Sequence, residues 1–227
     1  MKYGLIAAAA LASAVGTPAL AQNAVVNGSF ENGFANWLVV PGTGNDAPVV
    51  IAYNQASGYP TGAFGEAIPT DTVVGGSPDA AGNFTAYFSA DAVPNTLTQL
   101  VNLVAGTTYT IGFDYYVPRN GYNNPNDATL SFLINGAQIS SLTAGSASGT
   151  PVTTWQNFTT TFKATTSSPL TFQFQGRGST AADFAVDRVF AVAAVPESAT
   201  WGMMILGFGV IGAVARRRRT ADGLATA

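Results

Sequence analysis

The sequence lacks cysteine and histidine, and only 9% of its 227 residues are charged. Without cysteine the chain forms no disulfide, so buried apolar side chains have to hold the fold together. Without histidine it has neither a Ser-His-Asp nor a Cys-His catalytic pair, and no histidine-ligated zinc site. Carboxylates are the groups that remain for acid–base catalysis, and no pattern of acids in the sequence favours it. We therefore expect that the protein is not an enzyme.

Charge is one-sided in the central part of the chain, from Gln22 to Ala194. This part has four basic and ten acidic side chains, a net charge of −6. An acidic body of this kind disfavours nucleic acid and anionic lipid as partners, but it leaves a neutral sugar or a cation open. Its length predicts a single domain, which we place at residues 22–194.

The first 21 residues have the three parts of a secretory signal peptide. Lys2 supplies the positive charge, residues 5–15 form an alanine-rich apolar stretch, and Ala19-Leu20-Ala21 is a small-x-small cleavage site. We therefore expect residues 1–21 to be removed during export, with Ala19 and Ala21 at the signal cleavage site.

The C-terminal end combines three elements in a fixed order. Val195-Pro196-Glu197 comes first, Trp201 opens an apolar segment, and Arg216-Arg217-Arg218-Arg219 follows it. Residues 199–215 are just long enough for a transmembrane helix. The arginines place the short tail, residues 220–227, in the cytoplasm and everything before Trp201 outside it.

This order of elements resembles the PEP-CTERM sorting signal of Gram-negative bacteria, in the variant with a tryptophan after the Pro-Glu-Pro motif. The resemblance covers residues 195–219, with Ser198 where the second proline is usual and Gly202 where alanine is usual. It implies that an exosortase, a membrane-embedded protease, recognises the signal and cuts near Pro196-Glu197. The expected location is the inner membrane as an intermediate, and then the periplasm, the cell surface or the extracellular matrix.

Between the two ends, apolar and polar residues alternate as they do in strands. Tyr109 to Val117 and Leu170 to Gln175 both follow a period of two. Asn135-Gly136 separates two such runs and predicts a tight hairpin turn. About ten short strands of this kind predict an all-β jelly-roll sandwich. Longer loops are expected at residues 56–77 and 119–127, and such loops often carry binding residues.

The two ends of the body carry a second resemblance. The body opens with Val26-Asn27-Gly28-Ser29-Phe30-Glu31-Asn32-Gly33, and Asp187-Arg188-Val189 lies near its close. Together with Trp155-Gln156-Asn157-Phe158 these stretches resemble carbohydrate-binding modules with a galactose-binding-like jelly roll. Such modules often hold a structural calcium, which the resemblance implies at Glu31 and Asp187. The alternative is that Glu31 accepts backbone N–H groups and that Asp187 pairs with Arg188 or with solvent.

A sugar site requires an aromatic face and planar polar groups that orient hydroxyls. Alternation in the run 109–117 places Asp114 and Tyr116 on the polar side of that strand, away from Phe113 and Tyr115. Trp37 and Trp155 are expected in the core. The candidate ligand-binding residues are those on the polar side of this strand, in the loop after it and at a late strand end: Asp114, Tyr116, Arg119, Tyr122 and Arg177.

The sequence therefore predicts an exported, non-catalytic surface or matrix protein that binds extracellular polysaccharide and is held transiently by its C-terminal helix. One alternative is a purely structural matrix or adhesion component. Another is a carboxylate-based hydrolase, which requires two acids about 5–9.5 Å apart in one cleft. An exposed aromatic beside Asp114 or Arg119 would favour binding, whereas a flat face of threonine and serine would favour a structural role.

Overall fold

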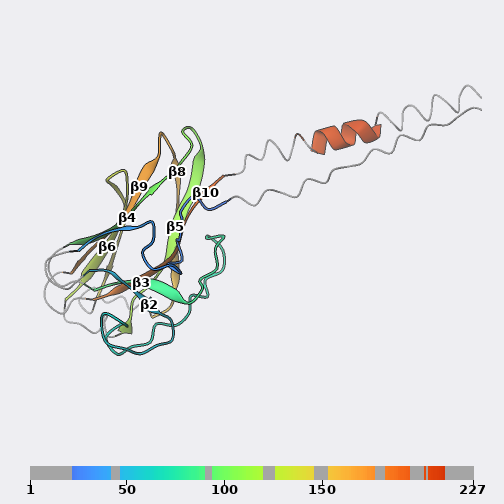
Figure 1. The fold of residues 1–227 in the computed structure, drawn as a ribbon. Helices are drawn as coiled ribbons and strands as arrows, with labels where there is room; N and C mark the ends of the chain where they lie inside the picture. Colours follow the sequence, from blue (N-terminus) through green and yellow to red (C-terminus); the bar gives the residue numbers. More distant parts are fainter. Residues whose placement is uncertain are drawn as a thin grey trace, which may run out of the picture.

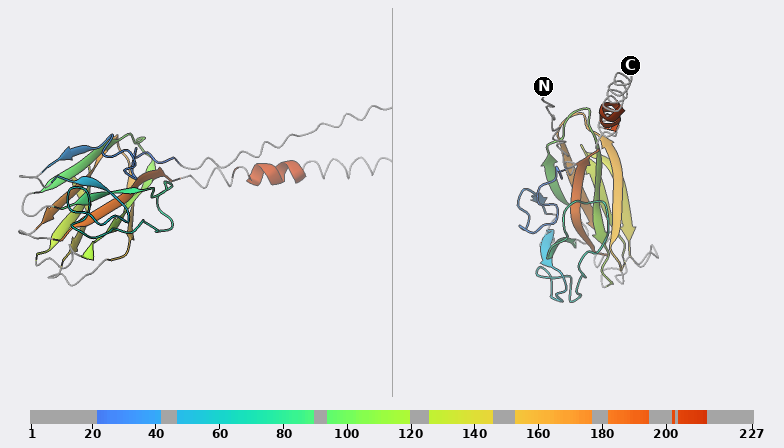
Figure 2. Two further views of the ribbon diagram at one scale, coloured as in Figure 1. Left: turned by 60° about the horizontal axis from the view of Figure 1, so that its bottom comes forward. Right: turned by 90° about the vertical axis from the view of Figure 1, so that its right-hand side faces the viewer.

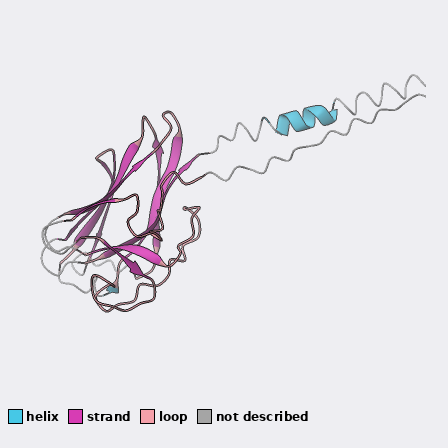
Figure 3. Ribbon diagram, in the orientation of Figure 1, coloured by secondary structure: helices cyan, strands magenta, loops and turns pink. Residues whose placement is uncertain are grey.

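The computed structural model describes residues 22–41, 47–89, 94–119, 126–145, 153–176, 182–194, 202 and 204–212, without the side chains of 174–176. Ten antiparallel strands form two five-stranded sheets that face each other (Figure 1, Figure 3). Sheet A has the order β2-β3-β10-β5-β8, and sheet B has the order β1-β4-β9-β6-β7. The all-β sandwich of about ten strands that the sequence predicts is confirmed. The strands are β1 (Leu38–Val40), β2 (Val49–Ala52), β3 (Phe84–Phe88), β4 (Asn95–Val101), β5 (Thr108–Tyr116), β6 (Ala128–Ile134), β7 (Ala137–Ala144), β8 (Gln156–Lys163), β9 (Ser168–Gly176) and β10 (Phe184–Ala193).

The main core lies between the two sheets and consists of the inward residues of each strand. Phe113 of β5 and Phe172 of β9 meet edge to face, with ring centroids 4.9 Å apart, and Phe132 of β6 packs against both. All three are fully buried. Burying a phenylalanine contributes roughly 1.5–3 kcal/mol, so this aromatic cluster joins the sheets in the absence of disulfides.

The predicted hairpin turn at Asn135-Gly136 is confirmed. Ile134 of β6 pairs with Ala137 of β7, and the two residues between them have φ values of 52° and 75°. A two-residue turn of this kind requires positive φ at both positions, which asparagine and glycine tolerate best.

A long loop, residues 54–82, covers the outer face of sheet A (Figure 1); we call it the covering loop. It forms a second apolar cluster with side chains that point outward from the sheet, among them Tyr87 of β3 and Tyr116 of β5. Trp155 closes this cluster, and its indole N–H donates to the Pro69 carbonyl at 2.7 Å. The central strands of sheet A, β3, β10 and β5, are therefore largely buried on both faces, whereas the edge strand β8 keeps exposed side chains.

Both ends of the body leave the sandwich side by side (Figure 1, Figure 2). Asn23 pairs with Val192 of β10, and the Ala194 N–H donates to the carbonyl of Thr108 at the start of β5. Tyr116, at the other end of β5, is about 27 Å away at the usual rise of an antiparallel strand. The sandwich thus has a tether end, at Thr108, and a distal end, at Tyr116.

Of the expected membrane helix over 199–215, the structure describes residue 202 and residues 204–212, all of which are helical. Within the described ranges, no helix combines the length and the hydropathy of a membrane span. Several residues of the predicted signals lie outside the described residues: Ala19, Ala21, Val195, Pro196, Glu197, Trp201, Arg216, Arg217, Arg218 and Arg219.

Two neighbouring glycines test how the covering loop packs on sheet A. Gly75 and Gly76 both have positive φ, 90° and 85°, but a Cβ on Gly75 would meet nothing, whereas one on Gly76 would lie 2.9 Å from the Asn157 amide nitrogen. We expect Gly75→Ala to lose about 1–2 kcal/mol of unfolding free energy through backbone strain. Gly76→Ala should lose roughly 1–3 kcal/mol more through overpacking. Equal losses in urea unfolding would show that the loop does not pack against Asn157.

Candidate functional site

A buried arginine ties the covering loop to sheet A. Arg188 has a φ of 50° where the ladder between β5 and β10 shifts register, between Asp187 and Phe190. Its Nη1 lies 3.3 Å from Asp114 Oδ2 on β5 and 3.7 Å from Asp71 Oδ2 in the loop. Its N–H groups also donate to three loop carbonyls, those of Val73, Ser77 and Asp79. One side chain therefore bridges the sheet and the segment that covers it.

The carboxylates around Arg188 are sealed from water. Asp114 is 0% exposed and accepts a hydrogen bond from the Asn157 side chain of β8. Burial, together with the neighbouring Asp71 carboxyl, raises the pKa of Asp114 to about 7, although Asn157 and Arg188 act in the opposite direction. Asp187 is also fully buried, and burial raises its pKa well above the usual range against the hydrogen bonds from Tyr53 and from the Arg188 N–H.

Asp114, which the sequence predicts as a ligand residue, has no access to solvent in this structure. Alternation along β5 correctly puts Asp114 on the face opposite Phe113, but that face is covered and not open. Asp114 belongs to the buried charge cluster that holds the covering loop.

Tyr116 and Arg119, two other predicted ligand residues, do come together at the distal end. Both line a surface pocket of about 510 Å³ with Gly65, Glu66, Ala67 and Thr153. The Arg119 N–H donates to Glu66 Oε1 at 3.0 Å, and this contact joins the end of β5 to the covering loop. Tyr116 is 4% exposed, and burial, followed by the Glu66 charge, raises its pKa. The other two predicted residues, Tyr122 and Arg177, lie outside the described residues.

Two aromatics of the covering loop, Phe64 and Tyr59, were not predicted as site residues from the sequence. Phe64 precedes the pocket residue Gly65, is 52% exposed and has a φ of 49°. Its ring stacks on Tyr59, with centroids 5.5 Å apart and planes 12° apart. A non-glycine residue with positive φ is uncommon and costs free energy. Phe64 is therefore an exposed aromatic next in sequence to a pocket residue, and no periodicity in the loop sequence marks it.

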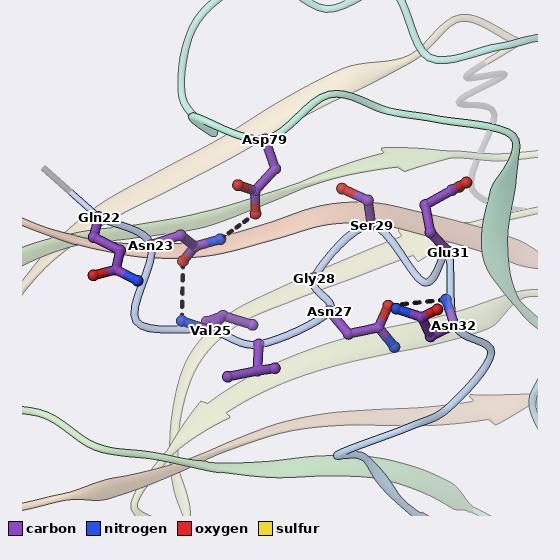
Figure 4. A pocket seen from close by; sticks show the side chains of 10 residues that line it. Gln22, Asn23, Val25, Asn27, Gly28, Ser29, Glu31, Asn32 and Asp79 are labelled. Carbon is purple, nitrogen blue, oxygen red and sulfur yellow. Dashed lines mark hydrogen bonds between the residues drawn. The ribbon is translucent and has the colours of Figure 1, made fainter. Parts of the chain in front are cut away.

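Glu31 and Asp187 do not fit a shared calcium in this arrangement. Glu31 lines another pocket, of about 440 Å³, which the N-terminal segment forms with Asp79 (Figure 4). Its Oε1 accepts the N–H groups of Asn83 and Phe84 at 2.7 and 2.9 Å, whereas Asp187 accepts from Tyr53 and the Arg188 backbone. In the part of the chain that the structure describes, no three acidic side chains are arranged to hold a metal. Calcium binding stays a prediction.

The outer face of sheet B has a different character. Thr98 of β4 donates to Thr171 of β9 at 3.1 Å, and Thr129 of β6 lies 3.3 Å from Thr143 of β7. The outward residues of the five strands, by alternation and register, are Leu38, Val40, Thr96, Thr98, Leu100, Thr129, Ser131, Leu133, Ser141, Thr143, Thr171 and Gln173, and none is charged. A face rich in threonine and serine is the feature expected of a purely structural matrix or adhesion component.

Comparison with known proteins finds no family model and no curated protein that matches this chain. Among solved structures, TmCBM61 in complex with β-1,4-galactotriose is 17% identical, with a TM-score of 0.44, over 76% of this chain and 99% of its own. A family 16 carbohydrate-binding module is 17% identical, with a TM-score of 0.41, over 75% of this chain and 99% of its own.

A third similar structure is the K1 cleaved adhesin domain of Lys-gingipain from Porphyromonas gingivalis W83. It is 14% identical, with a TM-score of 0.48, over 78% of this chain and 98% of its own. Similarity at this level identifies neither a ligand nor an activity, so the site has to be judged from its own residues.

The buried cluster predicts how stability depends on pH. The pKa of Asp114 is about 7 in the folded protein against an ordinary 3.8, so the folded state keeps a proton that the unfolded chain releases. The resulting stabilisation is complete below about pH 4 and is lost as the pH rises through about 7. The melting temperature should therefore be lower at about pH 8 than at about pH 5.

Asp114→Asn, which resembles the protonated acid, should flatten this decline in a melting series across pH. Lys163→Gln, which removes an exposed charge at the tether end, should keep the decline of the parent protein. If Asp114→Asn loses stability with pH as steeply as the parent, Asp114 does not hold the proton and the decline belongs to another buried acid, such as Asp187.

Proposed function

We propose that this protein is an exported, non-catalytic, polysaccharide-binding protein of the cell surface or extracellular matrix. The observation that carries the proposal is the pocket at the distal end, where Tyr116, Arg119 and Glu66 meet. The next residue before the pocket in sequence, Phe64, is 52% exposed. Sugar rings are recognised by a flat apolar face together with groups that bind hydroxyls, and this site has both.

The groups of the site have complementary tasks. Phe64, backed by Tyr59, presents an aromatic ring on which the C–H face of a sugar can lie. The Glu66 carboxylate accepts hydrogen bonds from hydroxyls, and the Arg119 guanidinium donates them. A hydrogen bond to a charged group contributes roughly 1.5–3 kcal/mol, so one site is weak but repeated copies along a polymer bind together.

The acids are distributed in a way that supports a non-catalytic role. Glycoside hydrolysis uses a pair of carboxyl groups that flank the substrate. Among the described residues of the pocket wall, Glu66 is the only acid, and Asp114 and Asp187 are buried beneath the covering loop.

The positions of the termini support display from a surface. The body leaves toward both predicted signals at the tether end, and the pocket lies at the distal end, about 27 Å away along β5. A protein held in the inner membrane by the helix at 199–215 would present the pocket away from the membrane. Recognition of residues 195–219 by an exosortase would then release it.

A structural matrix component is the second candidate. The uncharged outer face of sheet B favours it, because exposed sheet faces usually carry charged residues that prevent association. The two candidates differ in which surface contacts the polymer, and this difference can be tested.

A pair of substitutions separates the two surfaces. Phe64→Ala should weaken binding to the exopolysaccharide of the host about fivefold or more in affinity electrophoresis, because the stacking ring is lost. Leu100→Ala removes a side chain that is 66% exposed on sheet B and should change affinity less than about twofold. Phe64→Ala also removes ring contacts with Tyr59 and Tyr87, so melting curves have to show that the variant is folded at the assay temperature. The reverse result would assign binding to sheet B.

Processing has its own test. Intact-mass measurement of material released by the native host should show loss of residues 1–21 and of the segment from about Pro196 onward, because both ends carry cleavage signals. Replacing Arg216 to Arg219 with glutamine should leave the uncut form in the membrane fraction. A released protein that still carries the four arginines would contradict exosortase processing.

A further inference from the structure

We propose that the distal pocket selects a sugar that carries a carboxylate, such as a uronic acid residue of an acidic polysaccharide. This inference rests on the proposed polysaccharide binding and names the class of ligand for the same site. The inference follows from which lysine and arginine side chains of the body form ion pairs with carboxylates.

Three described cationic side chains belong to the body, and only one of them is both exposed and in a pocket. Arg188 is buried and paired with Asp71 and Asp114. Lys163 is exposed at the tether end, where it lies opposite Thr108 in the β5–β8 ladder, and is not among the residues that line the distal pocket. Arg119 is exposed in the distal pocket, and no described carboxylate forms an ion pair with its guanidinium.

Among the described residues, the Glu66 carboxylate does not form an ion pair with the Arg119 guanidinium. Its Oε1 accepts the backbone N–H of Arg119, so the contact between the two residues leaves the guanidinium donors available. A guanidinium is a planar fork that matches a carboxylate through two parallel hydrogen bonds, which makes a carboxylate its best partner.

The two charges together restrict the ligand further. A simple anion would satisfy Arg119 but would be repelled by the negative charge of Glu66. A neutral sugar would offer hydroxyls to Glu66 but no anion to Arg119. A uronic acid ring carries a carboxylate, which pairs with Arg119, and several hydroxyls, which accommodate the Glu66 charge, on one rigid frame.

The acidity of the body does not prevent this selection. The net charge of −6 repels a polyanion at long range. Charges separated by more than about 8 Å are largely screened at physiological ionic strength, whereas a pair in direct contact is screened much less. The local contact with Arg119 therefore decides the preference at about 0.15 M salt.

The experiment compares each acidic polymer with its own carboxyl-reduced form. Polygalacturonate and alginate are titrated into the processed, exported protein at about 0.15 M salt, and each is compared with the same polymer after its carboxylates are reduced to alcohols. The parent should bind at least one acidic form about tenfold or more tighter than its reduced form.

Arg119→Gln should abolish this preference while keeping the residual affinity for the reduced form. The matched control, Lys163→Gln, changes the net charge equally and should keep the preference of the parent. Arg119→Lys keeps the positive charge but not the planar guanidinium, and should retain part of the preference for the acidic polymer. Melting curves show whether the variants fold, and substitutions at these exposed positions should leave them unchanged.

The outcomes separate this inference from the proposal on which it rests. Equal affinity for acidic and reduced polymers overturns the carboxylate selection and leaves polysaccharide binding standing. If Arg119→Gln and Lys163→Gln lose the preference for the acidic polymer equally, the preference comes from net charge, and the carboxylate selection by Arg119 is also overturned. If neither the acidic nor the reduced polymer binds, the inference is overturned. If the host exopolysaccharide also fails to bind, the proposed function is overturned too.

Discussion

A single buried cation, Arg188, holds together the parts of this molecule on which its candidate site depends. It lies among acids from the sheet and from the covering loop, and it also donates to loop carbonyls. Removing one partner of such a buried pair commonly costs about 3–5 kcal/mol, because the other charge is left without compensation. The same loop supplies Gly65, Glu66 and Ala67 to the pocket, so the contacts of Arg188 with residues 71–79 help to hold the segment that forms the pocket wall.

The sequence allowed the sandwich to be predicted because strand formation leaves a local mark. Alternation identified β5 and β9, and Asn135-Gly136 identified the turn between β6 and β7. The two tryptophans were correctly assigned to the core, and the structure adds that each indole N–H has a backbone acceptor, at Asn27 for Trp37 and at Pro69 for Trp155. These features depend on residues close in sequence or on a repeated pattern.

The site could be predicted only in part, for a physical reason. A period of two tells which face of a strand a residue occupies, but not whether another segment covers that face. Asp114 and Tyr116 share the outer face of β5, yet Asp114 is enclosed under the loop and Tyr116 borders the pocket at the strand end. Phe64 and Glu66 lie in an aperiodic loop, and the approach of Glu66 to Arg119 is a tertiary contact that spans more than fifty residues.

The central claim is that the polysaccharide binds at the distal pocket and not on the flat face of sheet B. Backbone chemical-shift mapping during titration with an oligosaccharide of the host polymer tests it most directly. The account predicts that the largest shifts lie on Gly65, Glu66, Tyr116 and Arg119. Shifts concentrated on Thr98 and Thr171 of the sheet B face, with none around the pocket, would contradict it.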